Sequence, residues 1–148
     1  MGAKTVGILG GMGPDATIDL MARVIRTTPA EDDADHIRML VDNNPKVPSR
    51  IKAIIEGTGE SPAPCLAAMA QGLEKQGADF LVMPCNTAHT YLDDIRSAVA
   101  IPVMDMIGMA AERVSSISFE ADRVGIIAST AVLNIGLYDT AFKSCSLE

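Results

Sequence analysis

Cys85 is the residue in this sequence best placed to do chemistry. It stands in the stretch "LVMPCNTAH", residues 81–89, where an apolar run ends at Pro84 and short polar residues follow the cysteine. A thiol between a strand end and a helix start lies near the positive end of the helix dipole and near free N–H groups, which stabilise the thiolate. Asn86 and Thr87 add short polar side chains and backbone N–H groups that suit a carboxylate. The stretch therefore predicts a thiol poised to ionise beside an anion site.

The same cysteine has a second interpretation, as a small buried hydrophobic residue after an apolar strand, and both stay open here. His89 follows four residues later, so that on a helix the two side chains would share a face. They would then form a thiolate–imidazolium pair or half of a metal site. No second pair of ligands has metal-like spacing, so no metal ion is expected. Cys65 and Cys145 belong to no C-x-x-C pair and are expected to be structural or incidental.

Two further loops carry candidate binding features. The glycine-rich "GGMGP", residues 10–14, follows a short apolar run and either lets a ligand approach the backbone or simply makes a tight turn; we favour the ligand-facing version. It lacks the complete G-x-G-x-x-G pattern, so the signal for a dinucleotide is weak. In "DNNPKVPSR", residues 42–50, two prolines stiffen a loop that presents Arg50. The planar guanidinium of Arg50 suits a carboxylate, and an ordinary surface arginine is the alternative.

Short apolar runs alternate with longer amphipathic segments, and this alternation defines the fold class. The apolar runs predict five strands, at residues 4–10, 36–43, 78–84, 101–107 and 122–129. The amphipathic segments predict helices at residues 16–28, 64–77, 86–99, 108–117 and 130–144. In the first helix, Ile18, Met21, Ala22 and Ile25 lie on one apolar face. Because the strands are continuously apolar, we expect an α/β fold with an open parallel sheet and helices on both faces.

Parallel strands place their carboxyl ends at the same edge of the sheet, which is where ligands bind in open α/β folds. By this rule residues 10–17, 42–50 and 84–89 lie together at one edge. The sequence therefore predicts that the glycine loop, Arg50 and Cys85 share one crevice.

An internal similarity predicts the domain organisation. Residues 4–25 resemble residues 122–142, since both run from a polar entry through V-G-I into a turn and a helix. We expect a first α/β domain over residues 1–118, and over residues 119–148 the first strand and helix of a second, similar domain that the chain does not complete. A lone β–α unit cannot bury its apolar side chains, so a homodimer is expected.

Composition excludes several classes of partner. The chain has 148 residues, 48% of them apolar and 21% charged, with a net charge of −7. Such a chain can bury a core, and its negative charge disfavours nucleic acid and anionic membrane surfaces. No run approaches the ~18 apolar residues of a membrane helix, and no signal-peptide core is present. A cytoplasmic protein is therefore expected.

Taken together and in order, "GILGGMGP", "NNPKVPSR" and "MPCNTAH" resemble the aspartate/glutamate racemase family, most closely its aspartate racemase branch. The resemblance covers essentially the whole chain. It implies a cofactor-independent enzyme with two similar α/β domains, in which a cysteine from each domain exchanges the α-proton on opposite faces of an amino acid. It also implies roles for single residues: Cys85 as the first-domain acid/base, Asn86 and Thr87 at the α-carboxylate, Arg50 at the side-chain carboxylate, and Met12 lining the pocket.

This sequence departs from the family pattern in one respect. The second cysteine of the family normally stands in a G-C-T-E-like stretch that has no counterpart here, and "KSCSLE" around Cys145 does not match it. We therefore expect a partial racemase chain that supplies only the first cysteine. Two alternatives remain: a non-catalytic remnant that binds a small dicarboxylate, and an isomerase or lyase that uses Cys85 as a nucleophile on a small diacid.

Overall fold

A three-stranded parallel sheet forms the centre of the molecule. The computed structural model describes residues 4–117 and 123–145. The strands β1 (Val6–Gly10), β2 (Met39–Asn43) and β3 (Phe80–Val82) lie in the order β2-β1-β3. All five residues of β1 are buried, as expected for a central strand covered on both faces. The predicted α/β class and parallel sheet are confirmed.

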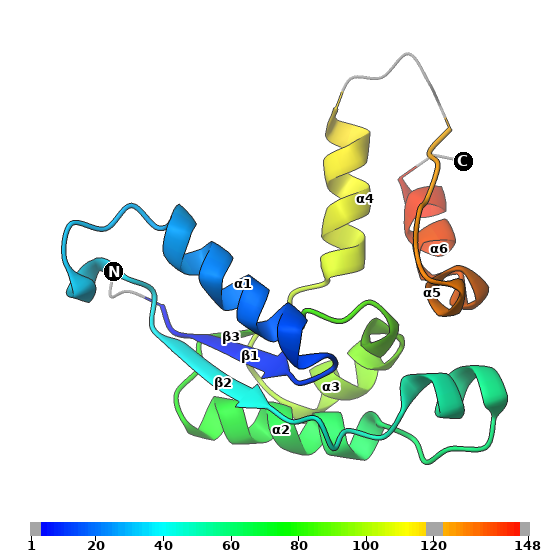
Figure 1. The fold of residues 1–148 in the computed structure, drawn as a ribbon, viewed down its shortest axis with the longest axis horizontal. Coiled ribbons are helices and arrows are strands. Elements are labelled where there is room, and N and C mark those ends of the chain that lie inside the picture. The colour runs from blue at the N-terminus through cyan, green and yellow to red at the C-terminus, as the bar shows by residue number, and fades with distance from the viewer. Residues whose placement is uncertain (1–3, 118–122, 146–148) are drawn as a thin grey trace.

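Helices cover both faces of this sheet (Figure 1). The helix α1 (Pro14–Thr27) lies on one face, and α2 (Ala63–Lys75) and α3 (Leu92–Ala98) lie on the other. The buried residues of α2 recur at helical spacing: Leu66, Met69, Ala70 and Leu73. The core therefore lies mainly between the sheet and α2.

The predicted apolar face of α1 is wrong in two of its four residues. Ile18 and Ile25 are 61% and 47% exposed, and the buried residue of this helix is Thr17. The Oγ1 atom of Thr17 accepts a hydrogen bond of 3.0 Å from the N–H of Gly11, in the loop that follows β1. This bond turns the Thr17 side of the helix toward the sheet, and Ile18 faces outward as a result.

Several predicted elements are shorter or divided. The fourth predicted strand contributes a single parallel bridge, between Leu81 and Val103, and residues 123–129 have no strand pairing within the described ranges. A strand exists only through hydrogen bonds to a neighbour, so an apolar run by itself is insufficient. The last predicted helix is divided into two helices, α5 (Thr130–Ile135) and α6 (Leu137–Ser144). Gly136 between them has a φ of 69°, which is not a helical value and interrupts the helix.

The remaining elements connect this framework. They are the 3₁₀ turns η1 (Asp33–Asp35) and η3 (Thr87–Tyr91), the π-helical turn η2 (Ile51–Glu56) and the helix α4 (Met106–Ser116). The turn η2 was not predicted from the sequence. The helix α6 packs against α4, away from the sheet (Figure 1). The predicted boundary between residues 118 and 119 lies outside the described residues, so the two-domain division stays a prediction. None of the helices in the described ranges is long and apolar enough to span a bilayer.

Candidate functional site

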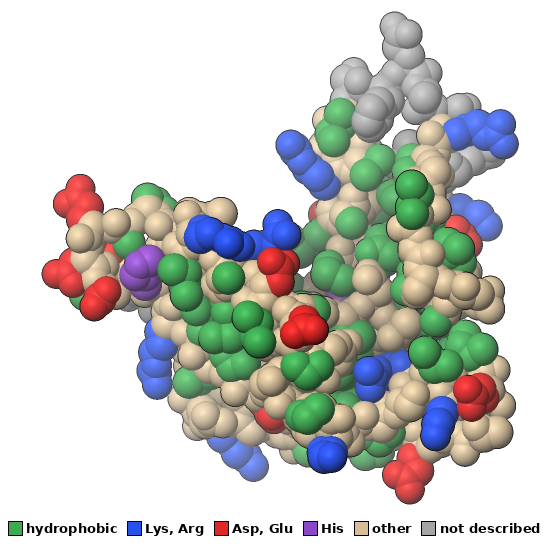
Figure 2. All heavy atoms as spheres, in the orientation of Figure 1, with side chains coloured by type: hydrophobic (Ala, Val, Ile, Leu, Met, Phe, Trp, Pro, Cys, Tyr) green, Lys and Arg blue, Asp and Glu red, His purple; other side chains and the backbone are tan. Residues whose placement is uncertain are grey.

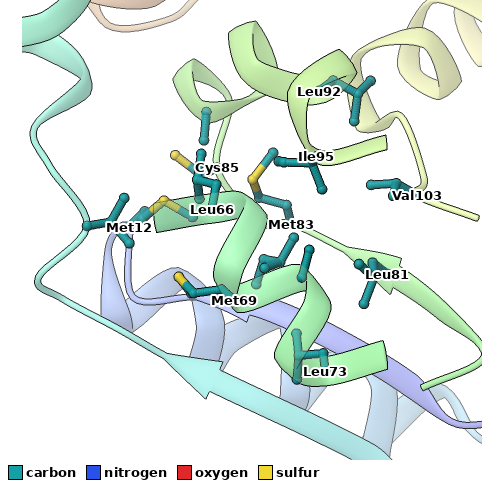
Figure 3. Close-up of a cluster of buried hydrophobic side chains, with 14 of the residues drawn as sticks. Met12, Leu66, Met69, Leu73, Leu81, Met83, Cys85, Leu92, Ile95 and Val103 are labelled. Atoms are coloured by element: carbon teal, nitrogen blue, oxygen red, sulfur yellow. The ribbon is translucent and has the colours of Figure 1, made fainter. Parts of the chain in front are cut away.

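The loops that follow the three strands meet at the carboxyl edge of the sheet. Gly10, at the end of β1, pairs with Asn43 at the end of β2, and the N–H of Asn44 donates to the carbonyl of Gly10. Beyond these ends Met12, Val47 and Cys85, one from each loop, belong to the same buried cluster. Figure 3 labels Met12 and Cys85 in this cluster. The glycine loop, the loop that carries Arg50 and the Cys85 segment are thus neighbours in the fold.

The thiol of Cys85 is buried at this edge, with the residue 7% exposed. Met12, Leu66 and Met83 surround it in the cluster (Figure 3). Its sulfur is within hydrogen-bond distance of the hydroxyl of Thr87, with 3.7 Å between Sγ and Oγ1. The side chain therefore has the burial of a small hydrophobic residue and, in addition, one hydroxyl neighbour that can exchange a hydrogen bond with it.

The segment after Cys85 is not the long helix that the sequence predicted. Asn86 precedes the five-residue 3₁₀ turn η3, and the α-helical part begins only at Leu92. A 3₁₀ turn closes i→i+3 hydrogen bonds and aligns few peptide dipoles, so the predicted support of a thiolate by a long helix dipole at this point is wrong. Thr87 is then the observed polar neighbour of the thiol.

His89 is turned away from the thiol. It is 5% exposed, its Nδ1 atom lies 2.7 Å from the carbonyl oxygen of Cys85, and its Nε2 atom accepts from the N–H of Met106 at 3.2 Å. Since Nε2 accepts, Nδ1 carries the proton and donates it to the carbonyl. Burial lowers the pKa of His89, although the carbonyl of Cys85 and the charge of Asp105 oppose this. The ring is neutral and does not form the thiolate–imidazolium pair considered from the sequence.

The guanidinium of Arg50 has one buried N–H group without a hydrogen-bond partner among the described residues. Its Nη1 group donates to the carbonyl oxygens of Val47 at 3.2 Å and Pro48 at 2.8 Å, which fixes the guanidinium against its own loop. The Nε atom is buried and has no hydrogen-bond partner among the described residues. Burial, and next the charge of Asp94, raise the pKa of Tyr91 at the end of η3, and the positive charge of Arg50 opposes this shift. A buried N–H without an acceptor is a place where a ligand oxygen would fit.

The glycine loop has an internal role. Gly11 has a φ of 90°, and a Cβ atom on it would lie 2.3 Å from the backbone carbon of Asn44. This glycine is therefore required for the close approach of two loops of the chain itself. The space in front of Gly11 is filled by Asn44, whereas nothing lies within 4 Å of the Cβ position of Gly13, so the ligand-facing interpretation of the loop stays a prediction. Met12, which follows it, is 8% exposed and packs in the Cys85 cluster.

Asn86 and Thr87 are both partly exposed beside the buried Cys85. Asn86 lines an open cavity of about 540 Å³ together with residues 124–129 and Tyr138. The hydroxyl of Tyr138 donates to Oδ1 of Asn86 at 2.7 Å. Tyr138 was not predicted as a site residue, and nothing in the spacing of positions 86 and 138 indicates that they meet.

Negative charge gathers at the opposite edge of the sheet. The loop that leads into β2 holds Glu31 and Asp32 and the acidic residues of η1, Asp33 and Asp35, and these four side chains are exposed (Figure 2). Because this loop precedes a strand, it lies at the amino edge, whereas Arg50 follows β2 at the carboxyl edge. The net charge of −7 is thus not concentrated where an anion would bind.

Comparisons with known proteins agree on one family. The sequence profile described as Asp/Glu/hydantoin racemase matches residues 9–148. The broad specificity amino-acid racemase RacX of Bacillus subtilis (strain 168) is 28% identical over 156 residues, which cover 97% of this chain and 62% of the relative. A glutamate racemase of Aquifex aeolicus (strain VF5) is 31% identical over 80 residues, 53% of this chain and 31% of the relative.

Solved structures agree with this result. The aspartate racemase of Picrophilus torridus superposes with a TM-score of 0.86 and 31% identity, over 99% of this chain and 61% of that one. An aspartate racemase homologue from Pyrococcus horikoshii OT3 has the same fold, with a TM-score of 0.76 and 20% identity over 98% of this chain and 62% of that chain. The chain spans about three fifths of the length of RacX and of these two structures.

Proposed function

The chain belongs to the Asp/Glu/hydantoin racemase family, and we propose that it supplies the first-domain cysteine of a cofactor-independent racemase for aspartate or a closely related acidic amino acid. The observation that carries the proposal is the position of Cys85 at the carboxyl edge, in one cluster with residues from the loops that hold Met12 and Arg50. Family membership and the 31% identity to an aspartate racemase support the reaction class.

The proposed roles follow from the donors that each residue has free. Cys85, as thiolate, removes the α-proton from one face of the substrate, and the resulting thiol can return a proton to the same carbon. Asn86 and Thr87 donate to the α-carboxylate. Arg50 donates to the side-chain carboxylate from its unpaired Nε and from the guanidinium N–H groups that its own loop does not engage. Met12 forms an apolar wall beside the thiol.

Inversion of the α-carbon requires a second acid on the opposite face. We propose that this group lies outside the 148 residues, in a second α/β domain of which residues 119–148 are the first part, after a first domain of residues 1–118. The RacX relative and the Picrophilus torridus structure extend well beyond the matched region, which is consistent with this division. A homodimer belongs to the same proposal, because it would cover apolar side chains that this part of the chain leaves exposed.

Binding of a small dicarboxylate without turnover is the second candidate. The unpaired, buried Nε of Arg50 supports carboxylate binding whether or not Cys85 reacts.

Exchange of the α-proton of aspartate in deuterated water tests the proposal. Proton NMR of L-aspartate incubated with the chain should show loss of the α-proton signal, because the Cys85 thiol exchanges its proton with solvent before returning it. Without a second acid the product should retain its configuration, which chiral chromatography measures. Cys85→Ser should abolish exchange, and Cys145→Ser, at the C-cap of α6, should leave it unchanged.

Binding is read separately, by calorimetry with succinate, an analogue that has no amino group. Binding without exchange would leave the dicarboxylate-binding candidate and reject the catalytic one. Absence of both binding and exchange would reject the two candidates together for this chain.

A further inference from the structure

Tyr138 and Asn86 form a hydrogen bond between parts of the chain that are 52 positions apart. The hydroxyl of Tyr138, in the first turn of α6, donates to Oδ1 of Asn86 at 2.7 Å. Asn86 is adjacent to Cys85 and precedes η3, so the bond connects α6 directly to the cysteine segment. The two residues also line the same cavity of about 540 Å³.

This bond determines which way the amide of Asn86 faces. A carboxamide has one oxygen that accepts and one NH₂ group that donates. With Oδ1 engaged by Tyr138, the NH₂ group lies in the same amide plane on the other side of the Cβ–Cγ bond. The hydrogen bonds of the described residues include none from Nδ2 of Asn86, so this donor is left for a ligand. A free amide could instead rotate and present its oxygen, which would repel a carboxylate.

We propose that Tyr138 is a positioning residue that holds the Asn86 amide with its NH₂ group available to a carboxylate beside Cys85. This inference rests on the proposed function for the identity of the ligand, but the orientation of Asn86 can be tested without it. Tyr138 acts through Asn86 and needs no contact with the substrate.

The surroundings of Tyr138 keep its hydroxyl in place as a donor. Its ring packs at 6.0 Å between centroids against Phe142, which is 7% exposed. Gly136, with a φ of 69°, ends α5 and starts α6 two residues earlier, which sets the direction in which Tyr138 leaves the helix. Burial, and next the charge of Asp105, raise the pKa of Tyr138, so the hydroxyl remains protonated through the neutral range.

The first experiment compares Tyr138→Phe with Tyr91→Phe, the same change at the other tyrosine of the chain. Tyr138→Phe keeps the ring that packs on Phe142 and removes only the hydroxyl. The side-chain NH₂ signals of Asn86 in ¹H–¹⁵N spectra, assigned by their loss in Asn86→Ala, should shift in Tyr138→Phe and stay in place in Tyr91→Phe. Succinate affinity by calorimetry should fall roughly threefold to tenfold in Tyr138→Phe, the size of one neutral hydrogen bond.

A second measurement uses the unmodified chain and needs no variant to fold. Raising the pH above 10.0, the ordinary value for tyrosine, should move the side-chain carbonyl ¹³C signal of Asn86 as Tyr138 ionises at its raised pKa. The carboxylates near Tyr138, Asp105 in front of α4 and Asp139 next to it in α6, are unchanged in Tyr138→Phe, so the comparison of the two titrations isolates the tyrosine. The same titration of Tyr138→Phe should lack this change.

The outcomes separate the two proposals. Unchanged Asn86 signals in both measurements would overturn the positioning role of Tyr138, even if succinate binds. Signals that respond as expected in a chain that binds neither succinate nor aspartate would support the positioning role and reject the proposed function. Equal succinate affinity in Tyr138→Phe and the unmodified chain would show that the orientation of Asn86 is irrelevant to ligand binding and would also overturn the inference.

Discussion

The imidazole of His89 is hydrogen-bonded to the carbonyl oxygen of Cys85, with 2.7 Å between Nδ1 and the oxygen. Its other nitrogen accepts from the N–H of Met106, at the start of α4. One neutral ring therefore ties the cysteine segment to α4. In this arrangement His89 supports the backbone at the candidate site, and Thr87 is the hydrogen-bond neighbour of the thiol.

This arrangement predicts a pH effect on stability. The pKa of folded His89 is lowered from 6.5, so the unfolded chain binds more protons than the folded chain near this pH. The contribution of His89 to the free energy of unfolding is thus present above pH 6.5 and is lost as the pH falls through the lowered folded value. Urea unfolding between about pH 7.5 and about pH 5.5 should show this loss, and His89→Gln should flatten that part of the profile. Long-range ¹H–¹⁵N spectra showing a doubly protonated ring at pH 6.5 would contradict it.

Two glycine substitutions should change stability in opposite directions. Gly11→Ala places a Cβ at 2.3 Å from the Asn44 backbone at a φ of 90°, so we expect the free energy of unfolding to fall by about 3 kcal/mol or more. Gly72→Ala, within α2 with open space for the new methyl group, should raise it by about 0.5–1 kcal/mol. Thermal and urea unfolding measure both. Equal effects of the two variants would refute the packing described for Gly11.

Arg50 should dominate the affinity for dicarboxylates. Arg50→Ala should weaken succinate binding by roughly 2–5 kcal/mol, the range for removing one partner of a desolvated charge pair. Arg50→Lys should restore only part of it, because lysine lacks the planar fork. Arg26→Ala is the matched control, since Arg26 is exposed in the last turn of α1. Calorimetry measures all three, and unchanged affinity in both Arg50 variants would remove this residue from the site.

Self-association is the remaining prediction. Ile127 is fully exposed, and Leu133 and Met109 are 47% and 50% exposed, in the region of α4 and α5. Exposed apolar side chains in one region favour association, so light scattering at micromolar concentration should give a mass about twice that of one chain or larger. Ile127→Ser should lower that mass at equal concentration, whereas Ile25→Ser, on α1, is the control. A monodisperse monomer in the unmodified chain would reject the homodimer.

The sequence by itself determined the three strands of the sheet and their parallel direction. It also determined that the three loops after these strands meet at the carboxyl edge of the sheet. These follow from local properties: continuous apolar runs mark buried strands, and every loop after a parallel strand emerges on the same side. The proximity of the loops that hold Met12, Arg50 and Cys85 was therefore predictable before any side-chain contact was known.

The tertiary structure decided which partner each polar group has. His89 bonds to Met106 and Asn86 bonds to Tyr138, 17 and 52 positions away, and no periodic pattern relates such positions. The tertiary structure also decided that residues 123–129, an apolar run, pair with no strand in the described ranges. Hydrogen bonds are directional and short, so they depend on how separate elements pack. The exposure of Ile18 and Ile127 shows that burial of an apolar residue also depends on this packing.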